Sequence, residues 1–188
     1  MLLPCFGQFQ SRNMILTFEE IYKQYNSLVY NLALHYVQNA EDAQEITQDV
    51  FVSIHQSLHS FQSNSAPSTW VYRIAINKSL DFLKAQKRKK RFAFIISLFR
   101  PNSAGQPPDA PEKLHPGILL EQKESLQRLL DKINELPDNQ KTALILHKIE
   151  QKTQAEVGEI MNLSPKAVES LIQRAKTNLS KKLDSSEG

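Results

Sequence analysis

Cysteine, glycine and long apolar runs are scarce in this chain of 188 residues. The single cysteine, Cys5, excludes an intrachain disulfide framework and any multi-cysteine metal site. Only 5 glycines are present, and prolines cluster within 101–117, so few turn residues remain for a β-sandwich or barrel. The longest apolar run, 93–99, falls short of the roughly 20 residues that a membrane span requires. These absences favour an all-α fold without stable membrane insertion.

The charge balance is mildly basic, with 23 Lys and Arg against 20 Asp and Glu. Apolar residues make up 40% and charged residues 23%, which is ordinary for a globular protein. The first residues, MLLPCFG, lack the basic leader and long apolar core of a signal sequence. We therefore expect a cytoplasmic protein. Residues 1–13 are interpreted as an N-terminal extension, because helical periodicity begins at Met14.

Helical periodicity predicts three helices in the first half of the chain. Thr17 and Glu20 fit a capping box, and apolar residues follow at steps of three and four. A second helix is predicted over about 40–58. A third begins near Pro67, a residue favoured in the first helical turn, and runs into the tract 84–91, where six of eight residues are basic.

A proline-rich stretch separates this half from the next. Residues 92–117 are predicted to be a flexible linker, because their composition cannot form an apolar face. Beyond it, leucines and isoleucines spaced as one helix face span 119–136, and Pro137 ends that helix. Another helix is predicted over about 138–149. The two halves are therefore expected to fold separately.

The last 36 residues fit a helix-turn-helix. Thr153 and Glu156 form a second capping box, which opens a short helix ending at Asn162, a residue that tolerates the left-handed conformation. Ser164 as N-cap and Pro165 at the first helical position start the final helix. The small residue and the apolar residues that fix the helix crossing are Gly158, Leu163, Val168 and Leu171.

One side of the final helix carries side chains suited to DNA. These are Lys166, Glu169, Ser170, Gln173 and Arg174. Gln and Arg can read base edges in the major groove, and Lys contacts phosphates. The alternative is an ordinary helical hairpin with a solvated charged face. Agreement among the caps, the turn and the core positions favours DNA reading.

The basic tract and the helix before it extend this pattern. The tract 84–91 could neutralise phosphates, or be a solvated charge run or a nuclear targeting signal. Trp70, Arg73, Asn77 and Lys78 combine a ring with cationic and amide groups, which suits stacking and holding of single-stranded bases. Trp70 could equally be a core residue.

Two further groupings have less specific meanings. Asp42, Glu45 and Asp49 line one side of the second helix, as a protein-docking face or a merely solvated one. His55 and His59 share a helix face, but no third ligand accompanies them, so we expect neither a metal nor another cofactor. No partnered nucleophile is evident, and we expect no enzymatic activity.

Three segments together resemble the sigma-70 family in its extracytoplasmic-function (ECF) class, the two-domain promoter-specificity subunits of bacterial RNA polymerase. DAQEITQDVF at 42–51 resembles the polymerase-docking motif of region 2. STWVYRIAINKSLDFLK at 68–84 resembles its strand-opening and −10 recognition helix. Residues 136–183 resemble region 4 with its helix-turn-helix. The resemblance implies a region 2 domain at 14–91, the linker at 92–117 and a region 4 domain at 118–188.

The resemblance also implies roles for individual residues. Core polymerase would be bound by Asp42, Glu45, Gln48, Asp49 and Phe51; the −10 element by Ser63, Asn64, Ser65, Trp70, Arg73, Asn77 and Lys78; and the −35 element by Lys166, Glu169, Ser170, Gln173 and Arg174. Gln44 departs from the pattern where an acid is common, and Glu169 and Leu171 stand where basic residues are common.

The partners implied are core RNA polymerase, promoter DNA and an anti-sigma factor. The alternative is a stand-alone helix-turn-helix regulator, whose N-terminal helices dimerise or sense a ligand. An enzyme acting on nucleic acid is a more distant alternative, because no metal-binding or nucleophile constellation accompanies the helices.

Overall fold

The computed structural model describes residues 17–61, 65–99 and 129–184. Every regular element in these ranges is helical, which confirms the all-α prediction. The elements are α1 (Phe18–Val37), α2 (Ala40–Ser57), the 3-10 turn η1 (Leu58–Ser60), α3 (Pro67–Phe99), α5 (Asp138–Leu144), the π-helical turn η2 (Ile145–Ile149), α6 (Gln154–Met161) and α7 (Pro165–Asp184). Residues 129–134 are also helical. We call α1–α3 the N-terminal unit and the elements from 129 onward the C-terminal unit.

The N-terminal unit is a bundle in which α1, α2 and α3 pack pairwise. The predicted capping box is present, since the Thr17 hydroxyl accepts the Glu20 N–H and the Glu20 carboxylate accepts the Thr17 N–H. The backbone N–H and the hydroxyl of Thr17 both donate to the Glu20 carboxylate, and these two hydrogen bonds hold the pKa of Glu20 below its usual range. Asn39 caps α2 by accepting the Asp42 N–H at 2.9 Å. Apolar residues at helical spacing, among them Val29 and Ile54, are fully buried between the helices.

The C-terminal unit contains the predicted helix-turn-helix. The Thr153–Glu156 capping box starts α6, and Asn162 ends it in the left-handed conformation with φ 55°. Ser164 then accepts the Ala167 N–H at 3.2 Å at the start of α7. The helix expected over 138–149 is present, but its second half widens into the π-helical turn η2.

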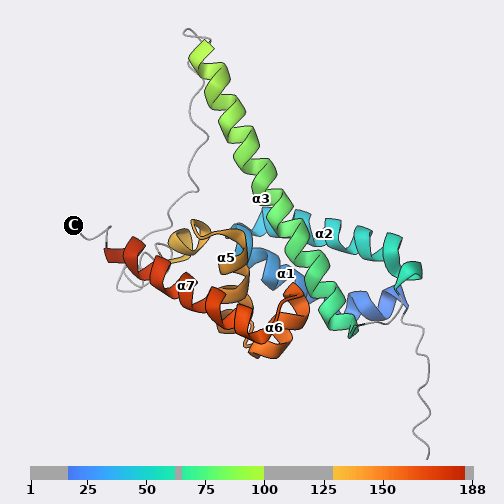
Figure 1. Cartoon of the computed structure of the whole chain (residues 1–188). Coiled ribbons are helices and arrows are strands. Elements are labelled where there is room, and N and C mark those ends of the chain that lie inside the picture. The colour runs from blue at the N-terminus through green and yellow to red at the C-terminus, as the bar shows by residue number, and fades with distance from the viewer. Residues whose placement is uncertain (1–16, 62–64, 100–128, 185–188) are drawn as a thin grey trace, which may run out of the picture.

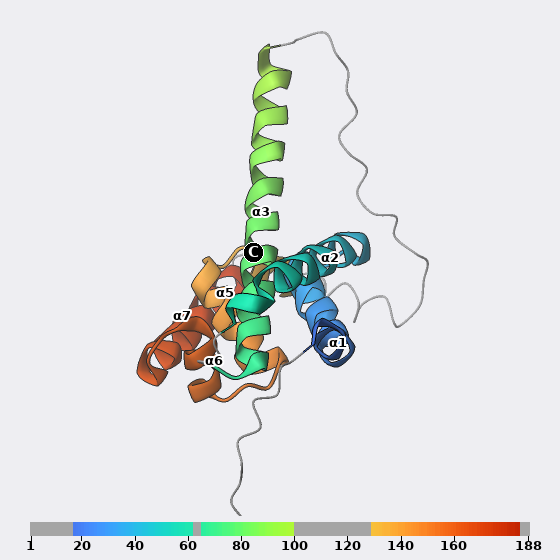
Figure 2. The same cartoon turned by 90° about the vertical axis from the view of Figure 1, so that its right-hand side faces the viewer.

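The third helix is longer than predicted. It runs to Phe99 and so includes residues 92–99, which the sequence analysis placed in the linker. Its C-terminal end projects beyond the bundle in both views (Figures 1 and 2). Residues 100–128 lie outside the described ranges, and with them the rest of the predicted linker and the first part of the helix face at 119–136.

The two units pack against one another, although the sequence suggested separate halves. α6 lies against α3 (Figure 1). Buried residues of both units, such as Val71 and Ile160, belong to one apolar cluster. A smaller cluster around Ile133, Leu136, Leu144 and Ala175 lies within the C-terminal unit. Linker composition could not reveal this contact, because it depends on surfaces far apart in the sequence.

Candidate nucleic-acid and protein interfaces

The outer side of α2 is an exposed strip that is acidic at one end and apolar at the other. Glu45 and Asp49 are exposed, and Asp42 is half-buried at the helix start. Val52 follows three residues after Asp49 and is 55% exposed. Spacings of three and four residues place all four side chains on one helix side. The structure thus brings the three predicted carboxylates together and adds an apolar neighbour that the sequence analysis did not single out.

Phe51 is placed differently from the expectation that it faces a partner. Its side chain is 5% exposed, and its ring centroid lies 4.7 Å from that of Tyr22 on α1. It lines a hollow of about 400 Å³ between α1 and α2, together with the exposed Gln48, Val52 and Tyr22. Phe51 therefore supports the docking strip from inside, because burial against α1 leaves little of its ring accessible.

Only some of the residues predicted to bind the −10 element lie within the part of the chain that the structure describes. Ser63 and Asn64 lie outside the described residues. Ser65 is half-buried, two residues before the start of α3. Trp70 is also half-buried, and its ring stacks on Phe61 with centroids 4.7 Å apart and planes 32° apart. The Trp70 ring is therefore packed like a core residue, and part of its surface is accessible to solvent.

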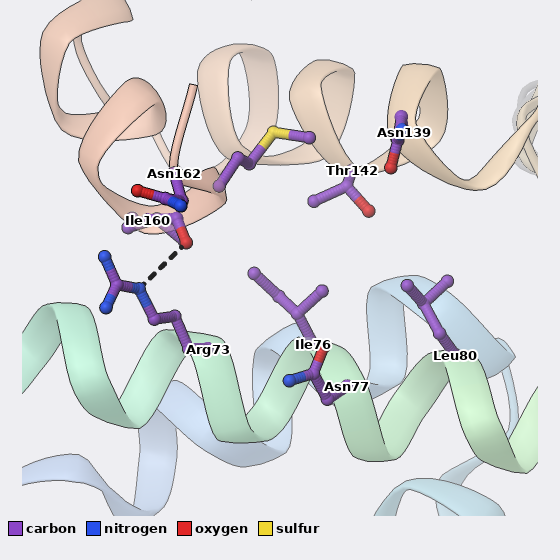
Figure 3. A pocket seen from close by; sticks show the side chains of 9 residues that line it. Arg73, Ile76, Asn77, Leu80, Asn139, Thr142, Ile160 and Asn162 are labelled. Carbon is purple, nitrogen blue, oxygen red and sulfur yellow. Dashed lines mark hydrogen bonds between the residues drawn. The ribbon is translucent and has the colours of Figure 1, made fainter. Parts of the chain in front are cut away.

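Arg73 has an intramolecular role that the sequence did not indicate. Its Nε donates to the carbonyl oxygen of Ile160 at 3.1 Å (Figure 3). Its Nη2 donates to the carbonyl oxygen of Glu159 at 2.6 Å. Both carbonyls belong to the last turn of α6, where helices leave acceptors unsatisfied and the dipole favours a cation. Arg73 thus caps a helix of the other unit.

The remaining −10 candidates lie further along α3. Asn77 is exposed and lines a cavity of about 430 Å³ between the two units, to which Asn139 and Asn162 also contribute (Figure 3). Lys78 is half-buried. The cavity shows that the contact between the units is incomplete beside Arg73.

A second cation crosses between the units in the opposite direction. Lys141 of α5 is 2% exposed, and its ammonium donates to the carbonyl of Tyr36, in the last turn of α1, at 3.2 Å. It also donates to the amide oxygen of Asn134 and lies 4.9 Å from the centroid of the Tyr36 ring. Burial is the main cause that lowers the pKa of Lys141 to about 8. Arg73 and Lys141 therefore cap each other's units reciprocally.

Tyrosines of the N-terminal unit complete the contact. The Tyr36 hydroxyl donates to that of Thr142 at 2.8 Å, and burial raises the pKa of Tyr36. The Tyr72 hydroxyl donates to the carboxylate of Glu150 at 3.0 Å, and burial raises the pKa of Tyr72 as well. The other oxygen of Glu150 lies 3.5 Å from His35 Nε2. Sequence patterns offer no signal for these pairs, because their members lie at least 78 residues apart.

The helix-turn-helix presents all of its predicted DNA-reading residues to solvent. Lys166, Glu169, Ser170, Gln173 and Arg174 are exposed. Val168, Ile172 and Ala175, on the opposite side of α7, are buried. Burial of one side fixes the rotation of α7, and this rotation gives the helix a polar outer face of the kind that enters a major groove.

Gly158 fixes how closely the two helices of this motif approach. A Cβ atom at Gly158 would lie 2.6 Å from the backbone oxygen of Leu163. The Leu163 N–H donates to the Gly158 carbonyl at 2.8 Å, which closes the turn. The predicted requirement for a small residue here is confirmed.

Two features are absent from the residues that the structure describes. Within the described ranges, no group of three or more His, Cys, Asp and Glu residues is placed to hold a metal ion. No helix in the same part of the chain combines the length and the apolar character needed to cross a bilayer.

Comparison with known proteins identifies the family. Residues 21–89 match the model for Sigma-70 region 2, and residues 126–179 match that for Sigma-70, region 4. The ECF RNA polymerase sigma-E factor of Haemophilus influenzae is 30% identical over 170 residues, which are 88% of this chain and 87% of the relative. The chain belongs to the ECF class of the sigma-70 family. It is a promoter-specificity subunit of bacterial RNA polymerase, and its family comprises transcription initiation factors rather than enzymes.

Solved structures agree with the fold of this sigma factor. The structure of CnrH in complex with the cytosolic domain of CnrY matches with a TM-score of 0.61 and 21% identity, covering 89% of this chain and 88% of the other. The sigma factor RpoE of Bartonella quintana, solved in complex with the anti-sigma factor NepR, matches with a TM-score of 0.57 and 16% identity, covering 89% and 96%. At these identities the likeness concerns the fold alone.

Proposed function

We propose that the sigma factor binds core polymerase through the α2 strip and contacts the two promoter elements with separate helices. Asp42, Glu45 and Asp49 give the strip its charge, Gln48 lies beside it, and Phe51 supports it from below. The strip is the observation that carries this proposal, because a stand-alone helix-turn-helix regulator has no need of an exposed acidic and apolar surface far from its DNA-reading helix.

Promoter opening is proposed to rest on α3 and the segment before it. Ser63, Asn64 and Ser65 would receive a base flipped out of the non-template strand, and Trp70, Arg73, Asn77 and Lys78 would contact the −10 element. Unstacking a base costs a few kcal/mol, and stacking on an aromatic ring returns about 1–3 kcal/mol. The half-buried Trp70 ring supports this role, since its partner Phe61 holds it in a fixed orientation. Captured bases would stabilise the open strand without chemistry by the protein.

The proposed DNA contacts require the two units to separate. Arg73 cannot reach DNA while it caps α6, and α3 and α7 must bind different promoter elements. We therefore propose a closed free form and an open form on polymerase. In it the region 2 domain, from residue 14 to the end of α3 at Phe99, and the region 4 domain at 118–188 are joined by the remaining residues of the predicted linker, 100–117. Residues 1–13 remain an N-terminal extension, and the protein acts in the cytoplasm, where its polymerase and promoters lie.

An anti-sigma factor is the further partner proposed. The Bartonella quintana relative was solved with such a factor, and the same fold is present here. The hollow between α1 and α2, with Tyr22 46% and Val52 55% exposed, supports the proposal by offering apolar surface beside the polymerase-docking strip. A partner that occupied this hollow would compete with polymerase.

The α2 strip predicts a charge-dependent docking step. Reversing Asp42, Glu45 and Asp49 to lysine should weaken binding to core polymerase at least about tenfold, because exposed charge pairs contribute about 0.2–1 kcal/mol each and reversal turns them repulsive. Asp49→Lys alone should act in the same direction. Binding is measured by competition for purified core polymerase at physiological salt, and circular dichroism checks the fold.

Glu19→Lys, an exposed reversal on α1 outside the strip, is the matched control. Unchanged affinity of the triple variant would remove the docking assignment. Co-elution with core polymerase and promoter-dependent transcription test the function as a whole. Binding of a dimer to DNA without polymerase would select the regulator instead.

The α7 face predicts a division between base reading and phosphate contact. Arg174→Ala should relax the preference at one or two −35 positions, because a bidentate arginine–guanine contact discriminates by about 1–3 kcal/mol. Lys166→Ala should weaken binding on all sequences alike and reduce the salt slope by about one. A library of −35 sequences selected with each holoenzyme measures both. Retention of every preference by Arg174→Ala would make Arg174 a backbone contact and leave reading to Glu169, Ser170 or Gln173.

A further inference from the structure

The basic tract at the end of α3 has no role in the interfaces described so far. Ala85 and Gln86 are still partly covered, whereas every residue from Lys87 to Phe92 is exposed. The helix continues to Phe99, so the tract stands on a projecting shaft rather than on a loop (Figures 1 and 2). The tract is exposed on this shaft, so a large partner can reach its cations.

The cations of the tract surround the helix. Lys87, Arg88, Lys89, Lys90 and Arg91 are consecutive, and at 100° per residue five consecutive positions cover the whole circumference. Lys84, one turn earlier, lies 3.6 Å from Asp138 and 3.9 Å from Asp81. No described carboxylate forms an ion pair with the five cations that follow. Their charge is therefore available to a polyanion.

The circumferential arrangement favours nucleic acid over a membrane surface. A helix that lies on a bilayer needs an apolar face along its length, and residues 87–91 have none. The major groove of DNA admits an α-helix and presents phosphates on both of its walls. A helix that is cationic on all sides can neutralise phosphates on both walls at once.

We propose that residues 87–91 bind the phosphates of duplex DNA on the upstream side of the −10 element. This rests on the proposed function, in which Lys78 and its neighbours contact that element. At 1.5 Å per residue the tract lies about 14–20 Å further along α3 than Lys78, a distance of about four to six base pairs. The chain after α3 leads to the helix-turn-helix, which must reach the −35 element. We therefore place the projecting end of α3 on the upstream side of the −10 element. The contact supplies affinity without reading sequence.

The test is the salt dependence of promoter binding by holoenzyme reconstituted from the full chain. Replacing Lys87, Arg88, Lys89, Lys90 and Arg91 with glutamine keeps helix-forming residues at exposed positions. The slope of log K against log salt should fall by about two to four, since each phosphate contact contributes about 0.9. A promoter with methylphosphonate linkages four to six base pairs upstream of the −10 element should show the same loss with the wild-type protein, and no further loss with the variant.

Lys23→Gln combined with Lys148→Gln, two exposed lysines on α1 and η2, is the control and should leave the slope unchanged. An unaltered slope in the tract variant, with promoter-dependent transcription retained, overturns this inference and leaves the proposed function intact. Failure of the wild-type chain to direct any promoter-dependent transcription overturns the proposed function itself. Sedimentation of the full chain with phosphatidylglycerol vesicles, lost in the tract variant while the DNA slope is unchanged, would replace the DNA contact with a membrane contact.

Discussion

Gly158→Ala is expected to disrupt the helix-turn-helix even though it adds a single methyl group. The new Cβ would lie 2.6 Å from the Leu163 carbonyl oxygen, a backbone atom that cannot rotate away. The turn must open to relieve the clash, and opening stretches the hydrogen bond from the Leu163 N–H to the Gly158 carbonyl. Overpacking of this kind costs about 1–3 kcal/mol, which exceeds the gain of up to about 1 kcal/mol from the higher helix propensity of alanine.

The expected result is a lower melting temperature and weaker −35 binding by the same variant. Thermal unfolding followed by circular dichroism measures the first, and holoenzyme binding to a −35 fragment measures the second. Gln154→Ala, at the start of the same helix, is the control and should change neither by more than a small amount. A melting temperature of Gly158→Ala equal to or above that of the wild type would contradict the close packing of α6 on the turn.

Much of this motif could be predicted from the sequence because its determinants are local. Thr153 with Glu156, Asn162, and Ser164 with Pro165 act within one or two helical turns, and each has the role that its chemistry predicts. The same holds for Thr17 and Glu20 at the start of α1. Caps and periodicity depend on neighbours a few residues away, so a single sequence contains the information that they need.

The features that escaped prediction depend on contacts between distant residues. The cationic side chain of Arg73 is typical of a DNA contact. Only its position opposite the C-terminus of α6 reveals that it caps this helix. The family resemblance implies that Phe51 faces polymerase, yet α1 covers its ring. The sequence does not indicate that Lys141 is buried, because lysine is rarely found in protein interiors. Helix α3 extends beyond its predicted end. The change in composition near residue 92 suggested that the helix ends there, but the helical propensities of the following residues do not require it to end.

Breaking the reciprocal caps is expected to open the protein. Arg73→Ala removes two charge-assisted hydrogen bonds to α6, each of which stabilises by about 1.5–3 kcal/mol, so the closed form should lose at least about tenfold in population. The distance between labels on the two units reports the change, with cysteines introduced at the exposed Gln56 and Ser180 and Cys5 replaced by serine. Lys78→Ala removes a cation from the same helix that forms no hydrogen bond with α6, and it should leave the distances unchanged.

The buried Lys141 adds a pH dependence of definite sign to the same equilibrium. In the closed form its pKa is about 8, lowered by burial and by nearby Lys87 against the opposing effect of Asp138. In the open form water reaches the ammonium, and its pKa returns toward the ordinary value near 10.5. Closure therefore releases a proton between about pH 8 and pH 10.5, and the closed form gains population as the pH rises through this range, by at most about tenfold per pH unit.

Below pH 8 the lysine is charged in both forms, and this dependence disappears. Label distances recorded from pH 7 to pH 10 should accordingly show progressive closure in the wild type. Lys141→Met, which fills a similar volume without a charge, should show none of it. A wild type whose distances do not respond to pH, or a Lys141→Met variant that responds as strongly as the wild type, would show that the charge of Lys141 is not coupled to closure. Such coupling would mean that the burial of one charged lysine makes the closed form of the sigma factor less stable. The N-terminal and C-terminal units could then separate when polymerase and promoter DNA compete for them.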